Sequence, residues 1–108
     1  CASSNAVRAC TYGGHNGSIP VVHIEFVAIA TLGNSVDFGN LTAGRRNGNG
    51  TSSPTRGVMS GGYEDPASVN KMEYIQFATL GNAVDFGDTT AAKYANTGAA
   101  SNGHGGLG

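Results

Sequence analysis

The alternation of apolar and polar residues along this chain is typical of short β-strands. It is clearest over 71–80, where Glu73, Ile75 and Phe77 point to one face and their neighbours to the other. Segment 21–32 is denser in Val, Ile and Phe, which are enriched in strands. Periodicity alone also fits a short helix there, but the flanking glycines favour a strand. The pattern therefore predicts an all-β protein.

A long internal repeat organises these strands. The sequence ATLGNSVDFG at 30–39 returns as ATLGNAVDFG at 78–87, with nine of ten positions identical and an offset of 48 residues. A fixed period of this size indicates a repeat architecture. The same offset aligns further identical or similar residues without a gap: Arg8 with Arg56, Gly13 and Gly14 with Gly61 and Gly62, Glu25 with Glu73, and Arg45 with Lys93.

Each 48-residue unit is predicted to contain four short antiparallel strands. Hairpin turns are expected at Gly33-Asn34 and Gly81-Asn82, because Gly and Asn accept positive φ. The fourth strand is weak in both units, at 47–52 and 95–100, and contains no large side chain. We expect it where space is tight or at an edge. Four antiparallel strands joined by turns are the plan of a β-propeller blade.

The repeat also sets the expected domain boundaries. Residues 1–7 end a preceding unit, 8–55 and 56–103 form two full units, and 104–108 begin a third. A propeller takes roughly four to eight blades, so these units give an incomplete one. We therefore expect the missing blades to come from a longer polypeptide or from other copies of the chain.

The spacing of conserved residue types within each unit resembles the kelch repeat. The residues that carry the resemblance are the double glycines, an acidic-aromatic pair, a phenylalanine and a small-residue corner with a cation: Gly13-Gly14 and Gly61-Gly62, Glu25-Phe26 and Glu73-Tyr74, Phe38 and Phe86, and Ala43-Gly44-Arg45 with Ala91-Ala92-Lys93. The repeat signature as a whole is Gly13, Gly14, Glu25, Gly33, Asn34, Asp37 and Phe38, and in the second unit Gly61, Gly62, Glu73, Gly81, Asn82, Asp85 and Phe86. Phenylalanine stands where kelch repeats usually have Trp, and the chain contains no Trp. The resemblance implies that these residues form a structural signature of kelch-like blades.

The sequence motif IATxGNxxDFGxLTxxR, followed by SSxTRGVxxGG, is similar to repeats in tail and other virion proteins of tailed bacteriophages. That resemblance implies a non-enzymatic structural protein of the virion, located in the particle or outside the cell. Its expected partners are other copies of itself and other virion proteins. Two alternatives remain open: a self-assembling extracellular fibre completed by strand exchange, and a lectin-like propeller that binds cell-surface glycan.

The recurring acidic residues are expected to be structural. Asp37 and Asp85 are predicted to bond turn amides, because residues one repeat apart lie in different blades and cannot form one catalytic pair. Calcium coordination with the neighbouring Asn side chains is the alternative. Glu25 and Glu73 are expected to pair with Arg8 and Arg56 within a blade.

The loop after each double glycine is the best candidate for ligand binding, because its sequence varies while its frame stays fixed. An aromatic ring beside carboxylate and amide groups can stack on a sugar and hydrogen-bond to it. The candidate residues are His15 and Asn16 in the first loop and Tyr63, Glu64 and Asp65 in the second.

Composition and charge narrow the classes further. The net charge is −1, the pI is near 6.3, and only 12% of residues are charged, which argues against nucleic-acid binding. No apolar run is long enough to span a membrane. The histidines do not recur at the period, and no cofactor or metal motif is present, so neither is expected. Cys1 and Cys10 can be unpaired thiols, a disulfide, or, for Cys1, the start of a processed lipoprotein.

Overall fold

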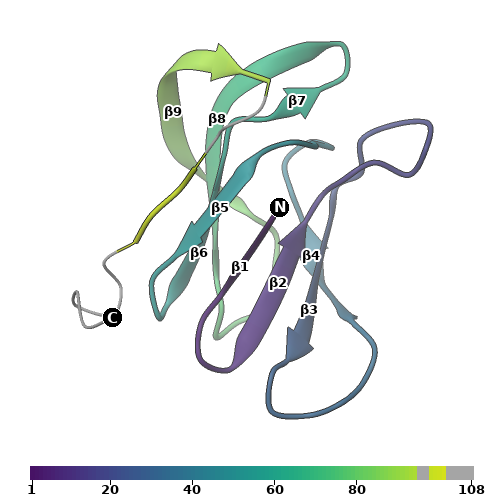
Figure 1. The fold of residues 1–108 in the computed structure, drawn as a ribbon, viewed down its shortest axis with the longest axis vertical. Helices are drawn as coiled ribbons and strands as arrows, with labels where there is room; N and C mark the ends of the chain where they lie inside the picture. The colour runs from purple at the N-terminus through teal and green to yellow at the C-terminus, as the bar shows by residue number, and fades with distance from the viewer. Residues whose placement is uncertain (95–97, 102–108) are drawn as a thin grey trace.

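The computed structural model describes residues 1–94 and 98–101, which form nine β-strands and no helix (Figure 1). The strands make two antiparallel sheets, so the all-β prediction is confirmed. Their bounds are β1 Ala2–Ser4, β2 Arg8–Tyr12, β3 His23–Ala28, β4 Val36–Asn40, β5 Asn49–Ser52, β6 Arg56–Ser60, β7 Tyr63–Glu64, β8 Ala67–Gln76 and β9 Val84–Lys93.

The first sheet is a four-stranded meander in the order β1-β2-β3-β4. Strand β2 pairs with β3 in continuous register from Arg8 opposite Ala28 to Tyr12 opposite Ile24. The β3–β4 pairing is interrupted by one register shift. Strand β3 is shorter than the predicted strand over 21–32, because the chain already turns where Thr31 N donates to Ala28 O at 3.4 Å. The turn therefore comes before the Gly33-Asn34 pair.

The second sheet has five strands, in the order β5-β6-β8-β7, and β9 also pairs with β8. Strand β8 begins at Ala67 and pairs with three other strands, β6, β7 and β9. Residues 63–68, expected to be a loop, instead form a small hairpin in which Tyr63 pairs with Ser68. The turn of this hairpin is Asp65-Pro66. Backbone pairing on both sides of that turn extends the sheet into the predicted loop.

The weak strand over 47–52 is β5, and it lies at an edge of the second sheet as predicted. It pairs with β6, the strand that follows it in sequence. Space is tight there: a Cβ on Gly50 would lie 2.3 Å from the carbonyl oxygen of Ala2 in β1. Ser52 Oγ also donates to Ser4 O at 2.6 Å. The absence of large side chains thus lets β1 and β5 lie side by side. Residues 95–97 of the corresponding second segment lie outside the described residues.

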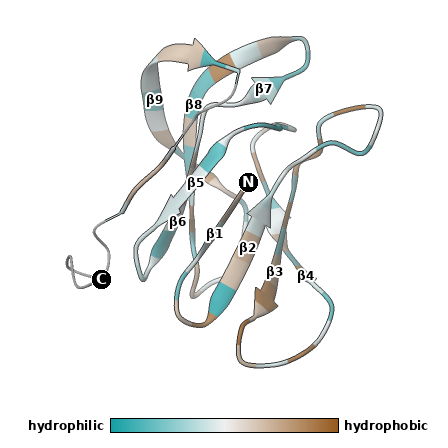
Figure 2. Cartoon of the chain, in the orientation of Figure 1, coloured by the Kyte–Doolittle hydropathy of each residue, from teal (hydrophilic) through white to brown (hydrophobic). Residues whose placement is uncertain are grey.

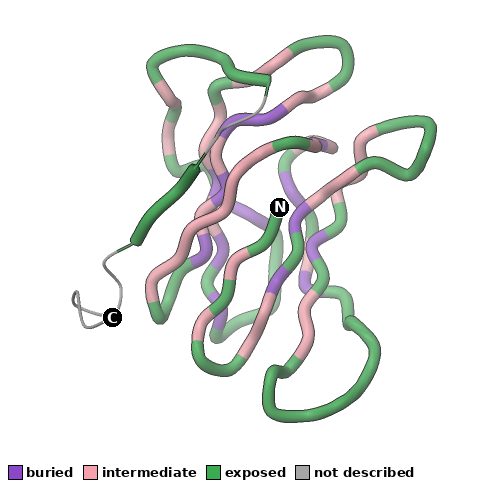
Figure 3. Tube along the Cα trace, viewed as in Figure 1, coloured by how far each residue is buried: buried purple, intermediate pink, exposed green. Residues whose placement is uncertain are grey.

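The hydrophobic core lies between the two sheets and draws on both (Figures 2 and 3). The first sheet and its following loop contribute Cys10, Tyr12, Ile24, Phe38 and Leu41, and the second contributes Met59, Ile75, Phe77 and Ala83. In β8 and just beyond it, Glu73, Ile75 and Phe77 are buried while their neighbours are not, which confirms the predicted alternation.

Backbone groups also join the sheets directly, at the edge formed by β4. Gly81 N donates to Phe38 O at 2.9 Å, and Ala83 N donates to Asn40 O at 2.8 Å. In return, Asn40 N donates to the side-chain oxygen of Asn82 at 3.0 Å. The turn that precedes β9 is therefore fixed against the first sheet, and the two sheets act as one body.

Gly39 lies at a tight contact between the first sheet and the turn that precedes β9. A Cβ there would lie 2.1 Å from Gly81 O, whereas a Cβ on Gly87, 48 residues later, meets nothing within 4 Å. The φ angles are similar, +157° and +145°. We expect Gly39→Ala to lower the free energy of unfolding by about 1–3 kcal/mol more than Gly87→Ala, since overpacking is costly. Urea unfolding of dilute protein measures the difference, and equal values for the two variants would contradict the tight contact.

Both cysteines are thiols, Cys1 exposed and Cys10 buried, so they form no disulfide. Burial raises the pKa of Cys10 to about 11, although the nearby Arg8 opposes the shift. Burial also raises the pKa of Tyr12 to about 12, against the effect of its hydrogen bond with Ser3. In the folded protein both groups keep protons that the unfolded chain has already released, and folding therefore loses stability as pH rises above about 9.

We accordingly expect the melting temperature to fall between about pH 9 and 12, from the release of these two protons on unfolding. The variant Tyr12→Phe has no phenol to titrate, so its melting temperature should fall less steeply above about pH 10. Calorimetry of both proteins across this range is the measurement. Parallel curves would show that Tyr12 does not contribute.

Candidate functional site

The charged groups at the centre of the structure are Arg45 and Glu73, which are 0% and 2% exposed. Arg45 lies in the corner after β4, and Glu73 is in the middle of β8, so the two come from different sheets. Buried charges are tolerated only when they are paired and hydrogen-bonded. This pair is both.

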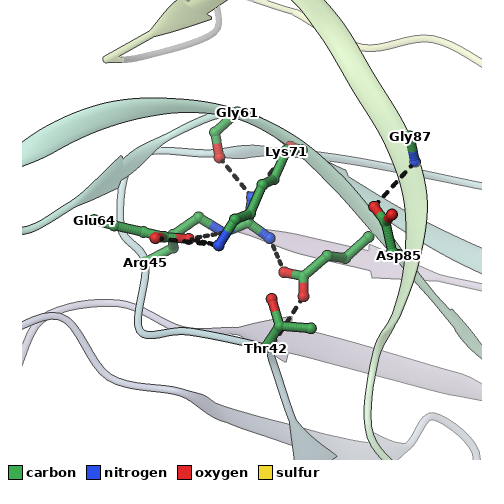
Figure 4. Close-up of polar contacts among 8 residues, drawn as sticks. Thr42, Arg45, Gly61, Glu64, Lys71, Asp85 and Gly87 are labelled. Atoms are coloured by element: carbon green, nitrogen blue, oxygen red, sulfur yellow. Dashed lines mark hydrogen bonds and ion pairs between the residues drawn. The ribbon is translucent and has the colours of Figure 1, made fainter.

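Arg45 is surrounded by acceptors (Figure 4). Its Nη2 donates to Glu73 Oε2, and its Nη1 donates to the carbonyl oxygens of Gly61 at 3.2 Å and Lys71 at 3.1 Å. Its Nε lies 3.9 Å from Glu64 Oε1, which also binds Lys71 Nζ at 3.0 Å. The planar guanidinium can reach all of these groups at once, which a lysine ammonium cannot.

The other oxygen of Glu73 also serves the contact between the sheets. Glu73 Oε1 accepts a hydrogen bond from the backbone N–H of Thr42 at 2.8 Å. The carboxylate therefore binds both the backbone and the guanidinium of the segment that leaves the first sheet. Burial lowers the pKa of the Arg45 guanidinium, and the carboxylate of Glu64 works against this shift.

The expected pairing of Glu73 with Arg56 is wrong. Arg56 is opposite Gln76 in the β6–β8 register, too far along the strand to reach Glu73, which is opposite Met59. The Arg56 guanidinium instead lies 4.8 Å from the centre of the Tyr74 ring.

The expected pairing of Glu25 with Arg8 is wrong for the same reason. Arg8 is opposite Ala28. Its guanidinium lies 4.8 Å from the centre of the Phe26 ring, and its Nη1 donates to Phe77 O of the other sheet. Glu25 is exposed and accepts a hydrogen bond from Ser35 Oγ at 3.2 Å.

The first candidate ligand loop satisfies its polar groups internally. The side-chain oxygen of Asn16 accepts hydrogen bonds from Ser18 N at 2.9 Å and Ile19 N at 3.0 Å. His15 Nδ1 accepts one from Gly17 N at 3.1 Å. Both side chains close their own turn, and in the described structure neither contacts the second candidate loop.

The second candidate loop is tied to the sheets. The Tyr63 ring packs on Tyr94, with ring centres 5.1 Å apart, and the Arg46 guanidinium lies 5.1 Å from its centre. Glu64 is held by Lys71, and Asp65 is exposed at the turn. A glycan would have to compete with contacts that the chain already makes.

Arg46 and Tyr94 belong to this cluster but were not among the predicted residues. They occupy equivalent positions 48 residues apart with different side chains, so the repeat gave no signal for them. The dipeptide Arg45-Arg46 was visible as a basic pair, but its two members diverge: one is buried against Glu73 and the other stacks on Tyr63. Only the path of the chain through the corner separates them.

The remaining signature residues lie in turns and strands. Asp85 accepts a hydrogen bond from Gly87 N at 3.2 Å. Asp37 is exposed in β4, beside the fully packed Phe38. Across residues 1–94 and 98–101, no three His, Cys, Asp or Glu side chains gather as a metal site would require. The same residues contain no helix long and apolar enough to cross a membrane.

A hollow of about 600 Å³ lies beside β5 and β6. Arg56 is the charged residue in its lining, and the others are mostly small or carry a hydroxyl group. The lining residues are Thr51, Ser52, Ser53, Arg56, Val58, Ala100 and Ser101. A hydroxyl nucleophile needs a neighbouring base to accept its proton. None of these lining side chains can act as one at neutral pH.

Comparison with known proteins finds no family model that matches this sequence and no curated protein that is significantly similar to it.

We expect Arg45→Met to reduce the free energy of unfolding by about 3–5 kcal/mol, because Glu73 is then buried without its counter-charge. Arg56→Met removes an exposed arginine over an aromatic ring and should cost about 1 kcal/mol or less. Denaturant unfolding of both variants provides the comparison. If Arg45→Met were no more damaging than its control, the buried pair would not be what joins the sheets.

Proposed function

We propose that this chain is a non-enzymatic structural protein built from kelch-like β-propeller blades, which serve as a rigid scaffold and interaction surface. The observation that carries the proposal is the Arg45–Glu73 contact. The first residue belongs to one proposed blade and the second to the next. A buried, multiply bonded ion pair between successive units is a contact that fixes their relative orientation.

Recurrence of backbone geometry supports this reading. Gly14 N donates to Arg45 O at 2.8 Å, and Gly62 N donates to Lys93 O at 3.1 Å. The first glycines of the two pairs, Gly13 and Gly61, have φ angles of +57° and +61°. Three more backbone bonds recur 48 residues apart: Val21 N to Gly14 O and Val69 N to Gly62 O, Ile29 N to Val7 O and Phe77 N to Thr55 O, and Gly13 N to His23 O and Gly61 N to Lys71 O.

The placement of the small-residue strands fits a propeller as well. Strands β1 and β5 lie in contact, each at the edge of its own sheet. Ala100 and Ser101, at the equivalent position after β9, line the hollow beside β5. Strands that converge on a common axis need small side chains there.

We place this scaffold in the virion of a tailed bacteriophage. This assignment is supported by the similarity of its repeated sequence motif to repeats in tail and other virion proteins of tailed bacteriophages. The alternative of a fibre built by strand exchange is less favoured, because β1 and β9 are already paired within the chain. In the candidate sugar-binding loops, His15, Asn16 and Glu64 likewise already make hydrogen bonds within the chain.

The test is whether the chain is part of a particle. Phage particles released by the source organism should be purified on a density gradient and probed by mass spectrometry and by an antibody raised against residues 1–94. We expect the chain to band with the particles. A cytoplasmic enzyme of the host, which should be absent from that band, is the negative control. Recovery of the chain only in the soluble fractions would contradict the virion assignment.

A further inference from the structure

The contact between the two sheets has an uncovered counterpart at each end of the molecule. The leading face is formed by residues of the second unit. Each of them lies 48 positions after a residue of the first unit that contacts the second sheet: Arg56, Ser60, Phe86, Gly87 and Lys93. The trailing face is formed by residues of the first unit. Each of them lies 48 positions before a residue of the second unit that contacts the first sheet: Ala9, Glu25, Val27, Ile29 and Ser35. Each face thus repeats one half of the internal contact.

The charges on these faces are complementary in the same sense as the buried pair. Lys93 occupies the position of Arg45, and Glu25 occupies the position of Glu73. Both are exposed, and in the described part of the chain neither forms an ion pair. The backbone around Lys93 matches that around Arg45, since each carbonyl accepts from the second glycine of its pair.

The apolar groups on the two faces are also uncovered. Phe38 is 3% exposed where it packs between the sheets, whereas its counterpart Phe86 is 51% exposed. Phe77 is 1% exposed, whereas its counterpart Ile29 is 52% exposed. Large side chains at these positions are buried when a neighbouring sheet is present and open to water when it is not.

The shapes match through a compensating exchange. Position 57 accommodates only glycine, because a Cβ there would lie 2.2 Å from the Tyr12 hydroxyl. At the open faces Ala9 stands in the place of Gly57, and Ser60 stands in the place of Tyr12. In the docked pair the methyl group of Ala9 would therefore face a serine and not a tyrosine. Gly87 leaves open space where Gly39 receives the turn at Gly81.

We propose that the leading face of one copy docks on the trailing face of a second copy, with Lys93 of one binding Glu25 of the other. This inference rests on the repeat architecture proposed above. The contact is head-to-tail, so it propagates until it closes into a ring or extends as a filament. With two blades from each chain, a closed propeller of about four to eight blades takes about two to four copies.

The test exchanges the charges between copies. The native mass of the 108-residue chain is measured by light scattering and analytical ultracentrifugation over a range of concentrations. We expect the wild type to assemble, and Glu25→Lys and Lys93→Glu each to remain monomeric, because like charges then meet. A 1:1 mixture of the two variants should assemble again, since each unlike pair is restored between chains.

Matched variants separate this contact from general effects. Asp65→Lys makes the same charge change as Glu25→Lys on the exposed hairpin turn, at a residue that belongs to neither face, and should assemble like the wild type. Gly87→Ala places a methyl group in the docking space and should raise the concentration needed for assembly. Lys93→Arg should lower that concentration, because a guanidinium can bind Glu25 and nearby carbonyls together. Circular dichroism confirms that each variant is folded.

A wild-type chain that stays monomeric at concentrations of about 100 µM and above would overturn the proposal, given that specific contacts commonly bind at micromolar levels or tighter. An assembly that tolerates both single charge reversals, or that the mixture fails to restore, would overturn it too, because another surface would then be responsible. Detection of the chain in virions is independent of these outcomes, so the two proposals fail separately.

Discussion

The fold depends on a buried ion pair that joins two sheets, neither of which buries its apolar face alone. Arg45 reaches out of the first sheet and is held by Glu73 and by two carbonyl oxygens of the second. Such a pair gives little net stability compared with an apolar replacement, because both charges lose water. What it provides is a directional contact: the two Nη atoms of Arg45 and both carboxylate oxygens of Glu73 find partners only when the corner after β4 meets β8 in this way. The apolar core around it supplies the stabilising free energy.

That geometry explains why small residues recur at the contact. Glycine occurs at Gly39, Gly50 and Gly57 because a neighbouring backbone or ring fills the place of a side chain. The high glycine content therefore reflects close approach between sheets as well as turns. A protein built from short strands with so few charged residues gains order by fitting sheets closely, and that rigidity suits the scaffold role proposed above.

The same contact relates the proposed functions at two scales. Inside the chain it orients one proposed blade on the next, and at the two open faces its counterparts offer the means to add further blades. Residues whose equivalents are buried, such as Phe86 and Ile29, are exposed at those faces. Exposed apolar side chains of this size are costly for an isolated molecule but useful to one that assembles.

The sequence by itself determined the all-β class, the 48-residue offset and the alternation of side chains along β8, because these follow from local periodicity and from identity between segments. It also limited 47–52 to an edge or a tight space, because the segment has no large side chain, and the structure places β5 in both. The signature glycines and aspartates were visible for the same reason. Local pattern is enough when the cause is local.

Only the tertiary structure decided the partner of each charge. Sequence favoured Glu73 with Arg56, but strand register puts them out of reach, and the corner after β4 brings Arg45 to the carboxylate instead. It likewise brought Tyr63, Arg46 and Tyr94 together, although Arg46 and Tyr94 are equivalent positions with different side chains and Tyr63 lies in a hairpin expected to be a loop. Such pairings depend on how two sheets meet, and that is set by packing over the whole contact, not by any one segment.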